Sequence, residues 1–301
     1  MKPAPFDYVA ATDLGHACAV LAEHGTDAVP LAGGQSLVPL LAMRLVRPKL
    51  LVDLNGLGEL DTLRVEDGAV LVGALARQRR VECSAAVRER LPLLATAIGY
   101  IGHPQVRHRG TVGGSLAYAD PTAELPIVAL ALDATVHCVH AAGPGRSCAA
   151  TEFFGTTGGT TLRPGELVRE VRFPVPPPGS GWAFHEVGRR QRDVALVGVA
   201  AVVRRDSAGV CVSARVALCG AHPAPVRAFH VERALLGRRP DRAAIADAAA
   251  EVGRDVDPPE DVHATADCRR YVATTLVGRA LAEAARRAGE EATGGTGDAD
   301  R

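Results

Sequence analysis

Two glycine pairs, each followed closely by a serine, are the features of this sequence with the clearest chemical meaning. The first pair lies in Leu31-Ala32-Gly33-Gly34-Gln35-Ser36-Leu37 and the second in Thr111-Val112-Gly113-Gly114-Ser115. Because glycine has no Cβ, backbone amides beside it can approach a ligand closely. Successive inward amides form an anion-binding concavity, and a serine hydroxyl adds a donor. One such segment can hold a phosphate, and two can hold a pyrophosphate from both sides.

Neither glycine pair matches an established phosphate-binding motif. The chain has no G-x-G-x-x-G sequence and no Walker sequence, and a lone Gly-Gly pair usually marks only a tight turn. Two pairs with the same following serine are harder to explain as turns. The residues alone therefore predict a phosphate-bearing ligand and do not identify it.

Other candidates for catalysis or metal binding are few. His103 and His108 lie in a polar segment beside Arg107 and Arg109, so we expect loop hydrogen bonding there rather than metal binding. Asp120 precedes a proline, which is typical of a turn. The run 189–192, Arg-Arg-Gln-Arg, could contact a phosphate, but we expect a solvated turn or a subunit contact. No Ser-His-Asp or Cys-His arrangement is evident, so we assign no catalytic and no metal-ligating residue.

Composition excludes several classes of protein. The 34 basic and 34 acidic side chains balance, so the broad basic field of a nucleic-acid binder is absent. No apolar run reaches the roughly 18 residues of a membrane span, and the N-terminus shows no secretory signal. The seven cysteines are scattered and contain no C-x-x-C. This pattern predicts reduced thiols in a cytoplasmic protein and no iron–sulfur cluster in this chain.

The first part of the chain alternates short apolar runs with glycine-rich turns, as in a mixed α+β fold. The run 127–132 is apolar throughout, so it is either a helix or a buried strand. The other expected elements are strands at 50–54, 69–73 and 135–139 and helices at 14–24 and 91–98.

A proline-rich stretch at 174–181 is the strongest domain boundary, because proline fixes φ and removes donors. Beyond it, 194–204 and 210–218 are expected to form an antiparallel pair, the second strand alternating as one buried face requires. Two helices follow, one capped by Asp241 and running to about Val252, the other from about Ala266 to Ala288. The remainder, 289–301, is small and polar and is expected to be disordered.

Longer segments around the glycine pairs resemble a known family. Leu31 to Leu37 is followed by Arg47-Pro48 and Val52-Asp53-Leu54, and a second stretch runs from Ile101-Gly-His-Pro-Gln-Val through Tyr118-Ala-Asp-Pro-Thr-Ala-Glu-Leu-Pro126. These resemble the FAD-binding medium subunits of molybdenum hydroxylases, such as aerobic carbon monoxide dehydrogenase and the FAD subunit of xanthine dehydrogenase. The segments 153–166 and 183–193 also fit, so the resemblance covers nearly the whole chain in order.

The resemblance implies a set of FAD-binding residues. Glu124 falls where the family usually has an aspartate that contacts the flavin's sugar-alcohol chain, and His185 falls where xanthine dehydrogenase relatives have a lysine. Ile101 and Leu162 match apolar positions near the flavin, and a covalent flavin link through His103 or His108 is not expected. The full set of expected cofactor-binding residues is Leu31, Ala32, Gly33, Gly34, Gln35, Ser36, Leu37, Ile101, Thr111, Gly113, Gly114, Ser115, Tyr118, Glu124, Leu162 and His185.

The resemblance also implies the fold. It predicts an α+β chain with a two-subdomain FAD-binding domain of the vanillyl-alcohol-oxidase (PCMH) type over 1–177, its subdomains at about 1–55 and 56–177. A small antiparallel sheet with helices, like the C-terminal domain of carbon monoxide dehydrogenase flavoproteins, would occupy 178–288, before the tail at 289–301.

The function implied is electron transfer through one noncovalent FAD. The molybdenum cofactor and two [2Fe–2S] clusters would sit in a large and a small partner subunit, in a dimer of heterotrimers without membrane segment or nucleic acid. The partner clusters would reduce this FAD, which would pass electrons to an external acceptor. Two alternatives remain: a stand-alone flavin oxidoreductase of the same fold, and a nonredox scaffold subunit that has lost flavin. The substrate and the acceptor stay open.

Overall fold

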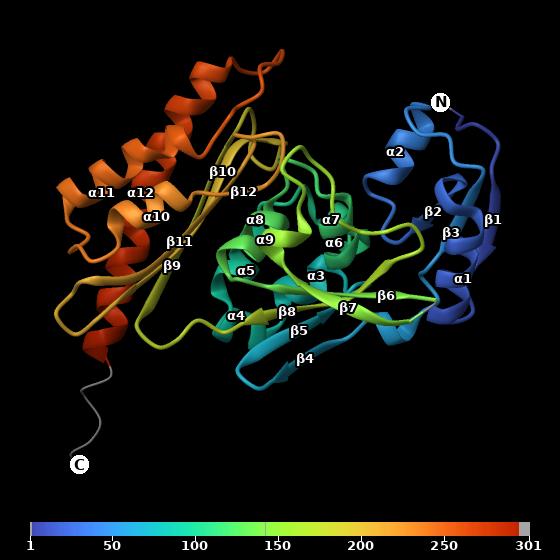
Figure 1. Ribbon diagram of the computed structural model, residues 1–301, viewed down its shortest axis with the longest axis horizontal. Helices are drawn as coiled ribbons and strands as arrows, with labels where there is room; N and C mark the ends of the chain where they lie inside the picture. Colours follow the sequence, from blue (N-terminus) through green and yellow to red (C-terminus); the bar gives the residue numbers. More distant parts are fainter. Residues whose placement is uncertain (1, 142, 295–301) are drawn as a thin grey trace.

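The chain folds into three units that lie side by side in sequence order (Figure 1). The computed structural model describes residues 2–141 and 143–294. Each unit has its own sheet and its own cluster of buried apolar side chains. The α+β architecture predicted from the sequence is confirmed.

The N-terminal unit is a small parallel sheet with strand order β1-β3-β2. Both β1 and β2 run parallel to β3, and α1 begins where the Asp13 side chain accepts a hydrogen bond from the His16 amide. The predicted strand at 50–54 and helix at 14–24 are confirmed. The elements are β1 (Asp7–Ala10), α1 (Leu14–His24), η1 (Gly25–Asp27), β2 (Ala28–Leu31), α2 (Leu37–Ala42), β3 (Leu50–Asp53) and η2 (Gly58–Leu60).

The central unit is a five-stranded antiparallel sheet with helices on one face. Its strand order is β4-β5-β8-β6-β7, and β8 returns from far along the chain to pair between β5 and β6. The strands are β4 (Leu63–Glu66), β5 (Ala69–Gly73), β6 (Thr135–His140), β7 (Gly143–Ala149) and β8 (Leu167–Pro174). The helices are α3 (Gln78–Cys83), α4 (Ala85–Arg90), α5 (Pro92–Ile98), α6 (Pro104–Arg109), α7 (Val112–Tyr118), α8 (Glu124–Ala131) and α9 (Ala150–Phe153).

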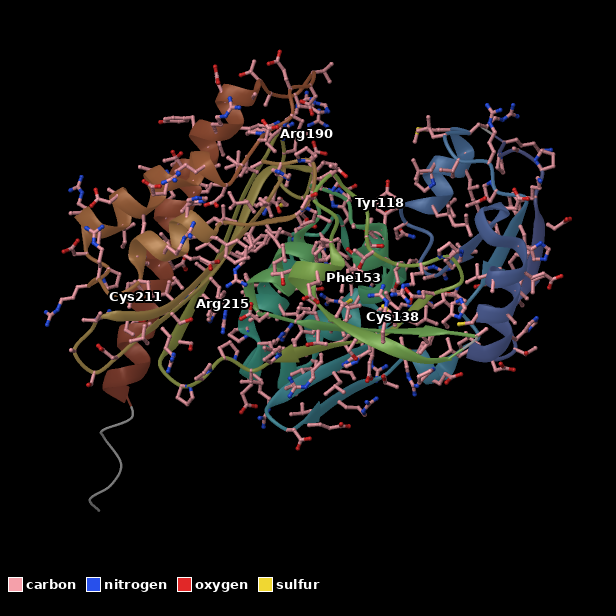
Figure 2. All side chains as sticks on the ribbon, in the orientation of Figure 1. Tyr118, Cys138, Phe153, Arg190, Cys211 and Arg215 are labelled. Atoms are coloured by element: carbon pink, nitrogen blue, oxygen red, sulfur yellow. The ribbon has the colours of Figure 1, made fainter. Side chains whose placement is uncertain are left out.

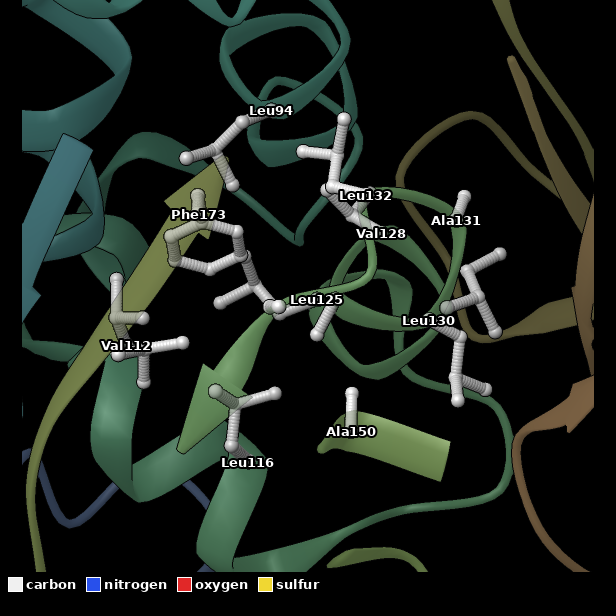
Figure 3. Packing of buried hydrophobic residues seen from close by; sticks show 14 of the residues in the cluster. Leu94, Val112, Leu116, Leu125, Val128, Leu130, Ala131, Leu132, Ala150 and Phe173 are labelled. Atoms are coloured by element: carbon white, nitrogen blue, oxygen red, sulfur yellow. The ribbon is translucent and has the colours of Figure 1, made fainter. Parts of the chain in front are cut away.

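Helix α8 is the centre of this unit. Every residue from Glu124 to Ala131 is buried, and Figure 3 shows Leu125 and Val128 packed with Phe173 and Leu94. A helix that is apolar all round must be covered on all sides. The apolar run that the sequence left open between helix and strand is therefore a buried helix.

The C-terminal unit is a four-stranded antiparallel sheet, ordered β12-β11-β10-β9, with three helices on its outer face. The predicted strand pair and the Asp241 cap, which accepts from the Ala244 amide, are confirmed. The elements are β9 (Ser180–Gly188), β10 (Ala195–Arg205), β11 (Cys211–Cys219), β12 (Val226–Arg227), α10 (Phe229–Leu235), α11 (Arg242–Ala250), η3 (Glu251–Arg254) and α12 (Ala266–Gly294).

Two expectations about this unit are wrong: that its second strand has a single buried face, and that a disordered tail begins at residue 289. The second strand does not have one buried face, because Ala217 and Cys219 pack against the central unit while Val216 and Leu218 pack under the outer helices. A register shift near Arg204 also leaves Val212 exposed. Strands β9 to β11 thus form a layer that the central unit covers on one side and the outer helices cover on the other.

The tail also begins later than expected. Helix α12 continues to Gly294, and an ion pair from Arg286 to Glu290 supports the turn that crosses residue 289. The rest of the expected tail, 295–301, lies outside the described residues. Within the described ranges, no helix is both long and apolar enough to cross a membrane.

Candidate functional site

A cavity of about 700 Å³ lies where the three units meet. Its walls come from the β2–α2 segment, from α7, from the first residue of α8 and the loops before both helices, from 162–168, and from the β9–β10 turn. This volume lies within the range of about 300–1,000 Å³ common for cofactor sites. The two glycine pairs, far apart in the sequence, meet in this cavity.

The first glycine segment presents unused backbone donors to the cavity. Residues 32–37 line it, and the amides of Gly33, Gly34, Gln35 and Ser36 donate to no other group in the described part of the chain. Hydrogen bonds in the segment instead use its carbonyls, as when Gly34 accepts from the Val38 amide at 2.9 Å. A run of free amides facing a cavity is suited to an anion.

The second glycine segment is built differently from the expected loop. Gly113 and Gly114 lie in the first turn of α7, which Thr111 caps by accepting from the Gly114 amide at 3.1 Å. The amides of 112, 113 and 115 are also occupied, by the carbonyls of Ala76, Ala74 and Thr111. This segment can therefore offer the Ser115 hydroxyl and the positive end of a helix, but not a row of free amides.

Close packing against other segments of the same chain requires glycine at positions 33 and 113. A Cβ at Gly33 would collide with the Arg109 carbonyl and approach Gly110 Cα at 2.9 Å, and a Cβ at Gly113 would lie 2.6 Å from Ala74 Cα. Backbone from the two segments thus touches directly. The absence of side chains here brings the walls of the cavity together.

A hydrogen-bonded chain fixes the two segments relative to each other. Asn55 donates to the Ala32 carbonyl at 3.0 Å and accepts from the Arg77 guanidinium at 2.7 Å. The same guanidinium donates to the Arg109 carbonyl at 2.7 Å. Asn55 is held in turn by Asp53, whose carboxylate accepts from its side-chain amide. This Asp53–Asn55–Arg77 network was not found from the sequence, because Arg77 lies 22 residues from Asn55 and no local pattern joins the two.

Two buried polar groups line the cavity with hydrogen-bonding capacity to spare. Gln78 is 4% exposed, and its Oε1 accepts no hydrogen bond in the described part of the chain. Glu124, the first residue of α8, is 8% exposed, and its carboxyl accepts a hydrogen bond from its own backbone amide but from no other residue that the structure describes. Buried polar groups are normally hydrogen-bonded. Both groups are therefore suited to a polar ligand that supplies the missing partners.

Burial raises the pKa of Glu124 to about 7, and the negative charge of Asp120 adds to the increase. Asp120 itself forms the expected turn, because its Oδ1 accepts from the Thr122 amide at 2.8 Å and the Thr122 hydroxyl at 2.6 Å. Glu124 is thus poised between its neutral and ionised forms near neutral pH.

The structure brings 14 of the 16 expected cofactor-binding residues to the cavity wall. Ile101 reaches it from the loop before α6, which Arg107 holds by donating to the carbonyls of Ile101 and Gly102. Tyr118 is 46% exposed and is labelled in Figure 2 on the side of the central unit facing the N-terminal unit. Those lining the wall are Ala32, Gly33, Gly34, Gln35, Ser36, Leu37, Ile101, Thr111, Gly113, Gly114, Ser115, Tyr118, Glu124 and Leu162.

Leu31 and His185 are not brought to the cavity wall. Leu31 ends strand β2 behind the loop. His185 lies on β9 with its side chain toward α12, where its Nε2 is 2.7 Å from Glu283 Oε2. Side chains alternate along a strand, so the neighbouring Glu186 faces the central unit instead. Arg163 and the turn 192–195 also line the cavity. The resembling segments include Arg163 and residues 192–193, but the sequence analysis did not assign them to the site.

Comparison with known families assigns both halves of the chain. Residues 4–176 match a family described as the FAD binding domain in molybdopterin dehydrogenase. Residues 182–284 match the CO dehydrogenase flavoprotein C-terminal domain. Together the two matches span nearly all of the described residues.

Full-length relatives agree with these matches. The chain is 43% identical to 6-hydroxypseudooxynicotine dehydrogenase complex subunit alpha of Paenarthrobacter nicotinovorans, over 96% of this chain and 97% of the relative. It is 36% identical to the carbon monoxide dehydrogenase medium chain of Hydrogenophaga pseudoflava, over 93% of this chain and 97% of that one. A solved carbon monoxide dehydrogenase structure from Hydrogenophaga pseudoflava superposes with a TM-score of 0.92 at 37% identity, covering 95% of this chain and 99% of that chain.

Proposed function

Because the chain belongs to the family of FAD-binding subunits of molybdenum-containing dehydrogenases, we propose that it carries one noncovalent FAD in the cavity between its three units. The observation that supports this placement most directly is the row of free amides from Gly33 to Ser36. These amides would hold the pyrophosphate, with hydroxyl donors from Ser36 and Ser115 at its two sides.

Other cavity residues fit the remaining parts of FAD. The Glu124 carboxyl would accept hydrogen bonds from the sugar-alcohol hydroxyls, and the unpaired Gln78 Oε1 would accept one from a further donor on the ligand. Ile101 and Leu162 would provide apolar contact to the ring system. The bound flavin supplies redox chemistry, while the chain supplies position and electrostatics. No residue needs to act as an acid or base.

We further propose that electrons arrive from [2Fe–2S] clusters in a small partner subunit and leave to an external acceptor. A large subunit with the molybdenum cofactor would oxidise the substrate, and the assembly would be a dimer of heterotrimers. Two relatives are named for 6-hydroxypseudooxynicotine and caffeine and two for carbon monoxide. Similar medium subunits thus serve different substrates, which supports substrate choice outside this chain. The free cysteines, several of them buried, fit a cytoplasmic location.

For the division of the chain into domains, we keep the boundaries that the sequence predicts. We propose an FAD-binding domain over 1–177, divided near residue 55, and a C-terminal domain from 178. The proline-rich connection between β8 and β9 is the joint. In this arrangement the C-terminal unit contributes the β9–β10 turn to the cavity, so both domains take part in holding FAD.

Co-purification from the native host tests the subunit assignment. The tagged chain should bring down a molybdenum-containing large subunit and an iron–sulfur small subunit, and the isolated chain should carry flavin without oxidising an organic substrate. Efficient substrate oxidation by the isolated chain would favour a stand-alone flavin oxidoreductase. Recovery of the partners with no flavin in this chain would favour a scaffold that has lost its cofactor.

A further inference from the structure

A second carboxyl, that of the half-buried Glu186, lies at the junction of the central and C-terminal units, and one of its oxygens is fully buried. Glu186 is on β9 and pairs across the sheet with Gly198 of β10, which pairs in turn with Cys219 of β11. All three positions are on the sheet face that meets the central unit, where Cys219 belongs to the same core as α8. The Glu186 side chain therefore points into protein rather than toward solvent.

Gly198 provides the room for this carboxyl. A Cβ at Gly198 would lie 2.7 Å from Cys219 Sγ and 3.8 Å from Glu186 Oε2. Glu186 Oε2 is fully buried and accepts no hydrogen bond from any described residue. The loop that leads into α8 lies against the same strand end, because the Gly220 amide donates to the Pro121 carbonyl at 2.7 Å. The sheet thus brings an unpartnered acid close to the start of α8.

Two cations, Arg163 and Arg192, line the same cavity as Glu124, and the other charged groups that act on the two carboxyls are acidic. Burial, together with the charge of Glu124, raises the pKa of Glu186 to about 8. Asp120 acts on Glu124 from the α7–α8 loop, and burial with the charges of Glu124 and Glu186 raises the pKa of Cys219. Helix α5 carries no titratable group, and Arg227 of β12 contacts the other end of α8, at the Leu130 carbonyl. The described residues show no cation paired with either glutamate.

We propose that Glu186 is a positioning residue for Glu124: the two carboxyls hold one proton between them at neutral pH, so that Glu124 meets the ligand as a carboxylate while Glu186 stays neutral. This inference rests on the proposed FAD site. Two neighbouring carboxyls in a low-dielectric setting do not readily ionise together. The second ionisation would place an unpaired charge near the ligand-binding carboxylate, and FAD binding should then weaken as the pH rises above about 8.

The test is the pH profile of FAD affinity in the full chain. Apoprotein is titrated with FAD between about pH 7 and about pH 9.5, in the wild type, in Glu186→Gln and in Glu152→Gln, an exposed glutamate on α9. The wild type and Glu152→Gln should lose affinity above about pH 8, by up to about tenfold per pH unit, the limit for one linked proton. The glutamine of Glu186→Gln cannot ionise, so the FAD affinity of this variant should not fall above about pH 8. Matching profiles for wild type and Glu186→Gln would overturn the inference.

Thermal melting of the apoprotein gives an independent readout. A carboxyl whose folded pKa lies above its ordinary value of 4.5 costs stability progressively as the pH rises from there to about 8. Glu186→Gln and Glu186→Met should therefore melt above the wild type at pH 9 by several degrees more than at pH 5. An unchanged difference across this range would contradict the proposed carboxyl pair. If the wild type binds no FAD at any pH, the proposed function fails, and the melts still decide whether the pair exists.

Discussion

Replacing Arg77 with alanine should weaken FAD binding although Arg77 is not among the residues that line the cavity. One guanidinium joins the two walls, donating to the Asn55 side chain and to the Arg109 carbonyl at 2.7 Å each. A hydrogen bond from a charged donor contributes roughly 1.5–3 kcal/mol, and Arg77 is only part-buried, so water replaces part of each. We expect a total of about 1.5–3 kcal/mol, which corresponds to about a tenfold to hundredfold higher Kd for FAD.

The physical reason is preorganisation. Without Arg77 the β2–α2 segment and the start of α7 are freer in the apoprotein, so FAD must order them on binding. The assay is a titration of apoprotein with FAD, followed by flavin fluorescence, with thermal melting of the same apoprotein. Arg80→Ala is the matched control, because Arg80 also makes two hydrogen bonds, to Asp61, away from the cavity. Wild-type FAD affinity in Arg77→Ala, or an equal loss in Arg80→Ala, would refute the reasoning.

Three further variants test other parts of the site. Ser36→Ala and Ser115→Ala should each raise the Kd for FAD about threefold to tenfold, since each removes one neutral donor of roughly 0.5–1.5 kcal/mol; no change in either would remove the hydroxyls from the pyrophosphate site. Gly33→Val should lower the melting temperature of the apoprotein as well as FAD affinity, because the new side chain meets the Arg109 carbonyl; a normal melt would contradict the packing role. His185→Ala should leave the Kd within about twofold of wild type because the ring faces Glu283, and a large loss of flavin would place it back in the site.

Local signals predicted much of the fold. Apolar periodicity and capping located α1, α11 and the β10–β11 pair, because these depend on short-range pattern. The sequence could not settle residues 127–132, since a wholly apolar run has no face and only its burial on all sides identifies it as α8. The sequence also could not show that the sheet of the C-terminal unit is covered on both faces, because that depends on how the units pack.

For the candidate site, too, the sequence revealed what local patterns record and missed what depends on contacts between distant segments. Motifs and resemblance located the glycine segments and Glu124, whose residue types signal their chemistry. They included His185 in the site, whereas its side chain lies beside Glu283, because one position along a strand decides which face a side chain takes. They also treated the second glycine pair as a loop of free amides, whereas amides of this segment donate to the carbonyls of Ala74, Ala76 and Thr111. Arg77 and Glu186 act through contacts with distant segments, which no local pattern records.

The most direct test of the account is the flavin content and attachment of the purified full-length chain. We expect one FAD per chain. Acid precipitation should release this FAD into the supernatant, and the apoprotein should bind FAD again when it is added back. A chain that neither retains nor rebinds FAD would contradict the central claim. A yellow precipitate with a colourless supernatant would contradict the noncovalent site built around Gly33 to Ser36.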